Sequence, residues 1–77
     1  MTSEIKKVYE AIKNGKRKAN SIFITYKDIA EKTGLQITMV SSCIRILVKD
    51  KYIEKENHFN QKGAAVSNSY KILKLMN

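Results

Sequence analysis

Residues 25–55 carry two helix-like hydrophobic patterns separated by one glycine, and no other stretch limits the possible folds of this chain so strongly. The stretch reads TYKDIAEKTGLQITMVSSCIRILVKDKYIEK. Thr25 and Asp28 form a T-x-x-D pattern that is typical of a helix start. Gly34 stands where a helix often ends on a left-handed residue. The sequence therefore predicts a first helix of about two turns, closed by a tight turn at Gly34.

A second helix is predicted over residues 37–51. Its inward set is spaced by three, one and three residues, which only a helix satisfies: Val40, Cys43, Ile44 and Leu47. Gln36 is a poor N-cap, which favours a later start at Thr38. A short helix, a tight turn, the small residue Ala30 and the apolar pair Val40 and Cys43 together indicate a helix-turn-helix, in which the first helix braces the second.

The flanking segments predict the rest of an α+β fold. Periodic apolar residues predict a helix over about residues 3–14, and SIFIT, residues 21–25, is typical of a brief strand. Between them, residues 16–20 are interpreted as a basic loop. YIEKEN, from residue 52, predicts a strand, residues 60–67 a hairpin loop, and NSYKILKL a return strand with apolar Tyr70, Ile72 and Leu75. The expected order is helix, short strand, helix, helix and C-terminal β-hairpin, in a single domain over residues 1–77.

The charge balance favours an anionic partner. Fifteen Lys and Arg against seven Asp and Glu give a formal net charge of +8 in 77 residues. An excess of this size is typical of proteins that bind nucleic acid or a membrane surface. The alternative is that the lysines only keep the domain in solution.

Cysteine usage and catalytic motifs exclude several other classes. Cys43 is the only cysteine and cannot form an internal disulfide, and its place on the inward stripe favours a core residue over a redox sensor. With no apolar signal region or membrane-length run, we expect a cytoplasmic protein. His58 stands alone, which argues against a metal site and favours an ordinary exposed strand residue. Glu54 and Glu56 are interpreted as a solvated face. We expect no enzyme activity, no cofactor and no small-molecule ligand.

YKDIAEKTGL, followed by VSSCIRILVKDKYIEK and NSYKIL, resembles the winged helix-turn-helix domain of bacterial and phage DNA-binding proteins. The resemblance runs from about residue 5 to 74. It implies three helices with a short strand and a C-terminal β-hairpin wing, with a recognition helix over residues 37–51 in the major groove. The wing, residues 57–68, would touch the DNA backbone or the minor groove.

The resemblance also implies which residues meet double-stranded DNA. The recognition helix would present Thr38, Met39, Ser41, Ser42, Arg45 and Lys49, with Arg45 as a guanine or phosphate contact. Tyr26 and Lys27, at the start of the bracing helix, would meet a phosphate. The wing would contribute Asn60, Gln61 and Lys62. The basic loop Lys16, Arg17 and Lys18 would either add a phosphate contact or remain a solvated loop.

Alternatives stay open at the level of biological role. The leading interpretation is a small transcriptional regulator of a phage, plasmid or other mobile element. A replication-initiation or excision accessory domain shares the same pattern. Apolar Ile37 and Met39 either meet thymine methyl groups or serve a protein-interaction module. A homodimer is favoured, through the first helix or the C-terminal tail, because such regulators commonly bind palindromic sites.

Overall fold

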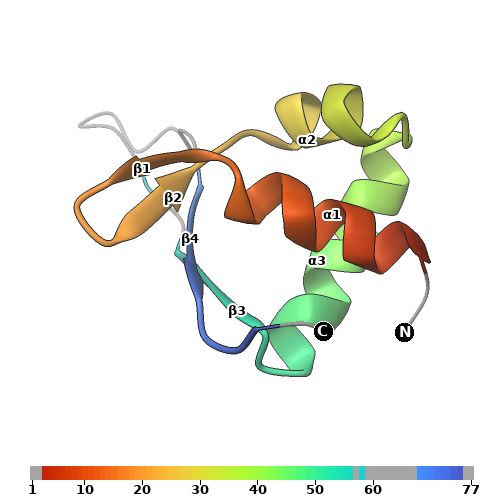
Figure 1. The fold of residues 1–77 in the computed structure, drawn as a ribbon. Helices are drawn as coiled ribbons and strands as arrows, with labels where there is room; N and C mark the ends of the chain where they lie inside the picture. Colours follow the sequence, from red (N-terminus) through yellow and green to blue (C-terminus); the bar gives the residue numbers. More distant parts are fainter. Residues whose placement is uncertain (1–2, 57, 59–67, 76–77) are drawn as a thin grey trace.

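The computed structural model describes residues 3–56, 58 and 68–75. Within them, three helices and four short strands follow one another: α1 (Ser3–Lys13), β1 (Lys16–Lys18), β2 (Ser21–Phe23), α2 (Tyr26–Thr33), α3 (Ile37–Lys49), β3 (Ile53–Glu56) and β4 (Ser69–Ile72). The helices gather at one end and the strands at the other (Figure 1). The predicted α+β winged-helix fold is confirmed.

Helix α1 forms because its apolar residues recur on one face, and that face is buried. The buried residues are Ile5, Val8, Tyr9, Ala11 and Ile12. Glu4 in the first turn and Lys13 in the last have the signs that complement the helix dipole. The helix ends close to the predicted boundary, and the Asn14 N–H still donates to the Glu10 carbonyl at 3.0 Å.

Gly15 lets the chain leave α1 directly over β2. A Cβ atom added at Gly15 would lie 2.8 Å from Ile22 Cγ2 and 3.1 Å from the Ile12 carbonyl oxygen. Glycine is therefore required here for close approach.

Both predicted ends of α2 are confirmed. Thr25 Oγ1 accepts a hydrogen bond from the Asp28 N–H at 3.0 Å, as an N-cap does. At the other end Gly34 is left-handed, with φ of 75°, and its N–H donates to the Ala30 carbonyl at 2.9 Å. Leu35, in the turn, is half-buried and packs against the core.

The inward face of α3 is as predicted, with Val40, Cys43, Ile44 and Leu47 all buried. The helix begins at Ile37, as the predicted range 37–51 has it, and the later start at Thr38 that Gln36 favoured is wrong, although the Gln36 side chain makes no cap hydrogen bond. Packing of the inward face therefore outweighs the missing cap.

Helix α3 ends at Lys49, two residues before the predicted end at 51. Lys51 has a positive φ of 65°, and the Tyr52 N–H donates to the Leu47 carbonyl at 3.0 Å. This is the pattern of a helix closed by a left-handed residue, with lysine where glycine is usual.

The strands form one antiparallel sheet in the order β1-β2-β4-β3. The prediction of a loop over residues 16–20 is wrong for residues 16–18, which form β1 and pair with β2. All three residues of β1 are exposed, so no alternation of apolar and polar residues marked the strand. The two-residue connection, Ala19 and Asn20, has φ of 56° at Ala19, as the first position of a tight hairpin turn requires.

Strands β3 and β4 are the base of the wing. Ile53 pairs with Ile72, and Lys55 pairs with Tyr70. Ile53 and Tyr70 are buried, so this face of the hairpin lies on the core. The predicted return strand stops at Ile72, and Leu75 is 67% exposed.

A short C-terminal segment ties the sheet to α1. The Tyr9 hydroxyl donates to the Lys74 carbonyl at 3.0 Å, and the Leu73 N–H donates to the Tyr52 carbonyl at 2.9 Å. The Tyr9 and Tyr52 rings meet edge to face, with centroids 6.3 Å apart. Among the helices that the structure describes, none has the length and apolar character needed to cross a bilayer.

Candidate nucleic-acid interface

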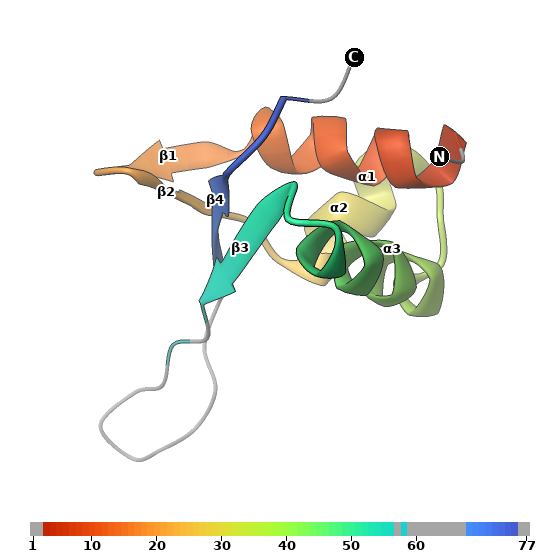
Figure 2. The same ribbon diagram turned by 90° about the horizontal axis from the view of Figure 1, so that it is seen from below.

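One face of α3 is free of the core and carries polar and basic side chains. Thr38, Ser42, Arg45 and Lys49 lie at spacings of four, three and four residues, which keep them on one helix face. Helix α1 packs along one side of α3 (Figure 2), and the buried residues of α3 do not include these four. Four of the residues predicted to meet DNA are thus brought together on one solvent-facing surface.

The flanks of α3 hold the other two predicted residues of this helix. Ser41 turns toward the wing side, where it lines a crevice with Tyr26. Met39 lies on the opposite flank and is 46% exposed. Ile37, with 51% exposure, and Ile46, with 39%, are further apolar side chains on α3 that the core leaves in solvent.

The Ser42 hydroxyl has a defined hydrogen-bonding role. It donates to the Thr38 carbonyl at 3.1 Å, one helical turn earlier. Because a hydroxyl has a single proton, its oxygen is left as an acceptor toward solvent. In this arrangement the Ser42 oxygen can accept from an incoming donor, such as the amino group of cytosine or adenine in the major groove.

The N-terminus of α2 approaches the same surface. Capping uses the Asp28 N–H, and the Ile29 N–H already donates to the Thr25 carbonyl at 3.0 Å. The N–H groups of Tyr26 and Lys27 come before these bonds and are available to an anion. Lys27 is exposed and Tyr26 is half-buried.

A crevice of about 300 Å³ separates α3 from the base of the wing. It is lined by Tyr26, Ser41, Ile44, Arg45, Val48 and Lys55. The Lys55 ammonium donates to the Tyr26 hydroxyl at 2.7 Å and lies 5.1 Å from the centre of the Tyr26 ring. We refer to this space as the α3–wing crevice. Residues 26 and 55 are 29 positions apart, so no local pattern could have shown that Lys55 belongs to the site.

Behind the crevice the Tyr70 side chain is fully buried. Burial, and then the neighbouring Tyr26, raise the pKa of the Tyr70 hydroxyl well above its ordinary value, so the hydroxyl stays protonated. The side chains of Tyr26 and Asn68 lie close to this hydroxyl, yet its oxygen has no hydrogen bond of good geometry. The Tyr70 hydroxyl therefore adds no charge beside Tyr26, and the charged residues that line the crevice are Arg45 and Lys55.

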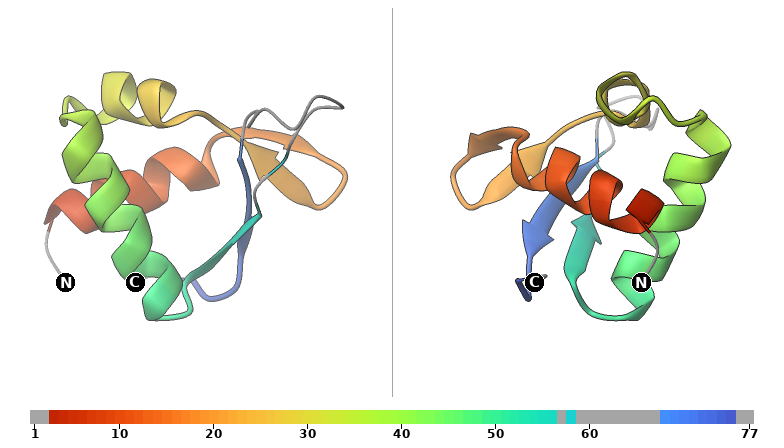
Figure 3. Two further views of the ribbon diagram at one scale, coloured as in Figure 1. Left: turned by 180° about the vertical axis from the view of Figure 1, so that it is seen from behind. Right: turned by 45° about the vertical axis from the view of Figure 1, so that its right-hand side comes forward.

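The basic residues of β1 lie away from this surface. Lys16, Arg17 and Lys18 are exposed on the outer strand of the sheet. Figure 3 shows the β1–β2 hairpin projecting at the opposite end of the molecule from α2 and the N-terminal part of α3. The predicted wing contacts Asn60, Gln61 and Lys62 lie outside the described residues, as does the wing segment 57–68 apart from His58 and Asn68.

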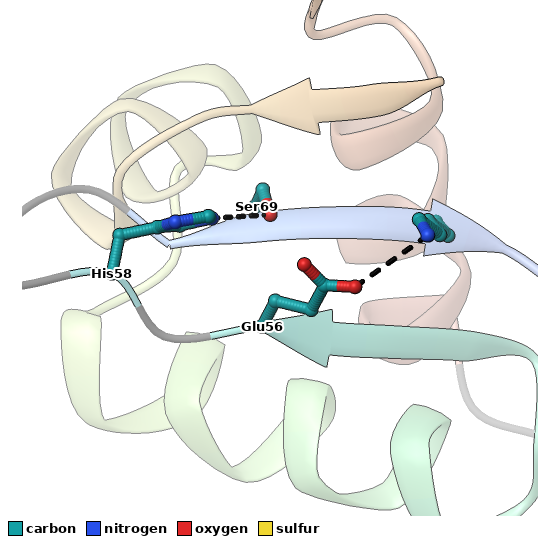
Figure 4. Close-up of polar contacts among 4 residues, drawn as sticks. Glu56, His58 and Ser69 are labelled. Atoms are coloured by element: carbon teal, nitrogen blue, oxygen red, sulfur yellow. Dashed lines mark hydrogen bonds and ion pairs between the residues drawn. The ribbon is translucent and has the colours of Figure 1, made fainter. Parts of the chain in front are cut away.

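His58 is not the exposed residue that the sequence suggested. Its Nε2 lies 2.7 Å from Ser69 Oγ in a hydrogen bond, and its ring lies on Phe23 with centroids 5.5 Å apart. Figure 4 shows His58 reaching from the wing side onto β4, beside the ion pair of Glu56 with Lys71 at 3.5 Å. His58 is therefore fastened to the sheet by Ser69 and Phe23.

The remaining candidates for metal or thiol chemistry are the His, Cys, Asp and Glu side chains. Within residues 3–56, 58 and 68–75, no three His, Cys, Asp or Glu side chains gather where they could hold a metal ion. Cys43 is 2% exposed and packed in the core, and burial, followed by the charge of Glu4, raises the pKa of its thiol. A buried protonated thiol is unreactive.

A short bracing helix, a left-handed turn, an exposed polar helix face and a following hairpin define the class of nucleic-acid-binding winged-helix domains. Residues 19–54 match the family model described as winged helix-turn-helix DNA-binding. Over this segment, which holds β2, α2, α3 and the start of β3, the chain is thus similar to winged helix-turn-helix DNA-binding domains. Neither the curated proteins nor the solved structures gave a match.

Proposed function

We propose that this protein is a small sequence-specific regulator of transcription that occupies a site on double-stranded DNA. The observation that carries the proposal is the outward face of α3, where Thr38, Ser42, Arg45 and Lys49 share one side of the helix. In a winged helix this face enters the major groove, while the wing follows the backbone or minor groove. The net charge of +8 supports an anionic partner.

We further propose that the regulator serves a phage, plasmid or other mobile element and acts as a homodimer on a palindromic site. The origin rests on the resemblance alone. Dimerisation is supported by apolar side chains left in solvent near the C-terminus, since Leu73 is 50% exposed and Leu75 is 67% exposed. A two-fold symmetric dimer would bind two half-sites about one helical turn apart.

The first experiment selects bound duplexes from a random pool and maps the protected region of the selected duplexes by footprinting. A regulator should yield one sequence, and two inverted copies of it if the protein is a dimer. The genomic position of that sequence then separates a promoter operator from a replication origin or an excision site, which is the alternative role. A pool that shows no enrichment would contradict sequence-specific binding.

Titration of a selected duplex at several salt concentrations tests the electrostatic contribution to DNA affinity. If Lys27, Arg45 and Lys49 each neutralise one phosphate, log K should fall against log salt with a slope of about −3. Arg45→Ala should lower affinity by about tenfold or more. The matched control is Lys7→Ala. Lys7 lies on the exposed face of α1, away from the outward face of α3, so the loss of its charge should change affinity much less. No binding of duplex DNA at low salt would overturn the proposal.

A second candidate function is a protein-interaction module, favoured by the exposure of Ile37 and Met39 on α3. Large apolar side chains exposed on the surface are typical of protein contacts when they form part of a larger apolar patch. Ile37→Ser with Met39→Ser separates the two functions. Loss of DNA affinity would support contact with thymine methyl groups, whereas unchanged DNA affinity would support a protein partner.

A further inference from the structure

The α3–wing crevice joins three parts of the molecule at one point. Tyr26 comes from the start of α2, Arg45 from the exposed face of α3, and Lys55 from the first strand of the wing. Lys55 is half-buried and its ammonium is fixed by the Tyr26 hydroxyl at 2.7 Å. Two cationic side chains thus line the same space, one from the helix and one from the wing.

The position of the crevice between helix and wing gives it a defined place on a duplex. When a recognition helix lies in the major groove and a wing reaches the adjacent minor groove, the strand between those grooves passes between the helix and the wing. That strand presents phosphate oxygens to whatever lines the gap, and phosphate contacts fix the register of a protein on DNA.

We propose that the α3–wing crevice holds one phosphate of this strand, with the Tyr26 hydroxyl as hydrogen-bond donor and Lys55 and Arg45 as cations on either side. The proposal rests on the proposed DNA-binding function and names the phosphate-binding residues of that same site. It adds Lys55 to the residues that touch DNA, and it gives Tyr26 a specific atom and role.

The hydrogen bond between Lys55 and Tyr26 decides the direction of donation. An ammonium group can only donate, so the Tyr26 oxygen accepts from Lys55. The phenolic proton is then left for another acceptor, which is either the neighbouring Tyr70 oxygen or an incoming phosphate oxygen, and the adjacent cation makes that proton a stronger donor. A phosphate oxygen at the mouth of the crevice is an acceptor of the right charge. Binding of the phosphate involves no proton transfer, because the Lys55 ammonium and the Tyr26 hydroxyl both stay protonated.

This assignment also changes the expected role of Arg45. A side chain that lines the crevice together with Lys55 is placed to pair with a phosphate, which carries no sequence information. Base discrimination would then depend on Thr38 and Ser42, further along the outward face. Arg45→Ala should weaken matched and mismatched duplexes by the same factor, whereas a guanine-reading arginine would lose discrimination at one base pair.

The experiment measures duplex binding by fluorescence anisotropy for Tyr26→Phe, Lys55→Met and the double variant, with a fluorescein-labelled mixed-sequence duplex at several salt concentrations. Tyr26→Phe removes one oxygen and keeps the ring, so affinity should fall about tenfold with an unchanged salt slope. Lys55→Met should lower affinity and reduce the slope by about 0.9, the value for one phosphate. In the double variant the losses should be less than additive, because both residues act on one phosphate.

The matched control is Lys71→Met. Lys71 lies on β4 opposite Glu54, on the other face of the hairpin from Lys55, and it pairs with Glu56 at 3.5 Å. It should change affinity much less than Lys55→Met does. Lys55→Arg should keep the wild-type slope. Thermal melts of each variant separate loss of binding from loss of folding, and Tyr26→Phe still tests the phosphate site if Lys55→Met melts early.

Two results would overturn this inference while leaving the proposed function intact. One is wild-type affinity in both Tyr26→Phe and Lys55→Met, for a protein that binds duplex with a steep salt dependence. The other is an equal loss in Lys71→Met and Lys55→Met, with no effect of Tyr26→Phe. If the wild-type protein does not bind the duplex at low salt, the proposed function fails and the phosphate site fails with it.

Discussion

Gly15→Ala should destabilise the fold through a single steric contact. The added Cβ would lie 2.8 Å from Ile22 Cγ2, a separation that real side chains do not show. Ile22 is fully buried, and its strand is paired on both sides, with Arg17 in β1 and Tyr70 in β4. Because β2 cannot move without disturbing both pairings, we expect the cost of overpacking, about 1–3 kcal/mol of unfolding free energy.

Thermal unfolding followed by circular dichroism measures this cost. For a chain of this size each kcal/mol lowers Tm by roughly 4–8 °C. A second variant, Ile22→Leu, removes the branching methyl group that the added Cβ would meet, and alone it should cost less than about 1.5 kcal/mol. In the double variant the two costs should not add, and we expect at least about 0.5 kcal/mol of favourable coupling.

The control is Gly34→Ala, where a Cβ would meet no atom within 4 Å and the cost comes only from the left-handed φ of 75°. It should cost about 1 kcal/mol and show no coupling with Ile22→Leu. A wild-type Tm for Gly15→Ala, or strict additivity with Ile22→Leu, would refute the steric reasoning.

Three further outcomes are expected. Thr25→Ala removes the cap on the Asp28 N–H and should lower stability by about 1 kcal/mol in urea unfolding, whereas Thr25→Ser should not. Lys51→Gly relieves the backbone strain of a positive φ of 65° at residue 51. It should raise the free energy of unfolding by about 0.5–1 kcal/mol, which a higher Tm would report. The raised pKa of the Cys43 thiol, caused by burial and then by Glu4, means that the unfolded thiol ionises first as pH rises. The contribution of Cys43 to the free energy of unfolding is therefore fully present below the thiol pKa of the unfolded chain and declines as pH rises above that value. Iodoacetamide at a pH of about 8 should label the Cys43 thiol of the folded protein far more slowly than that of the protein in urea.

The helix-turn-helix was predictable because its signals are local. A threonine cap, a left-handed glycine and the inward stripe of α3 each depend on residues within a few positions of one another, and the structure places all of them as expected. β1 was not predictable in the same way, because an exposed edge strand of three basic residues has no buried face to impose alternation.

The residues of the candidate site also fall into two groups, those that local sequence patterns predict and those that only the folded structure brings together. The outward residues of α3 follow from helical periodicity once the inward ones are known. The contact between Lys55 and Tyr26 depends on how β3 packs beside α2, and His58 depends on meeting Ser69 across the hairpin. Such contacts between distant residues exist only in the folded chain.

The basic composition of β1 also bears on how copies of this protein behave toward each other. Among the strands that the structure describes, β1 pairs only with β2, so its other side presents backbone groups that could extend the sheet into a second molecule. A second β1 placed there would lie about 5 Å from the first, so Lys16, Arg17 and Lys18 of one copy would face the same three residues of the other. This spacing is shorter than the Debye length of about 8 Å at physiological salt, so the repulsion persists where longer-range forces are screened. The repulsion thereby disfavours the addition of another strand to β1, so copies of the protein are kept from joining their sheets edge to edge.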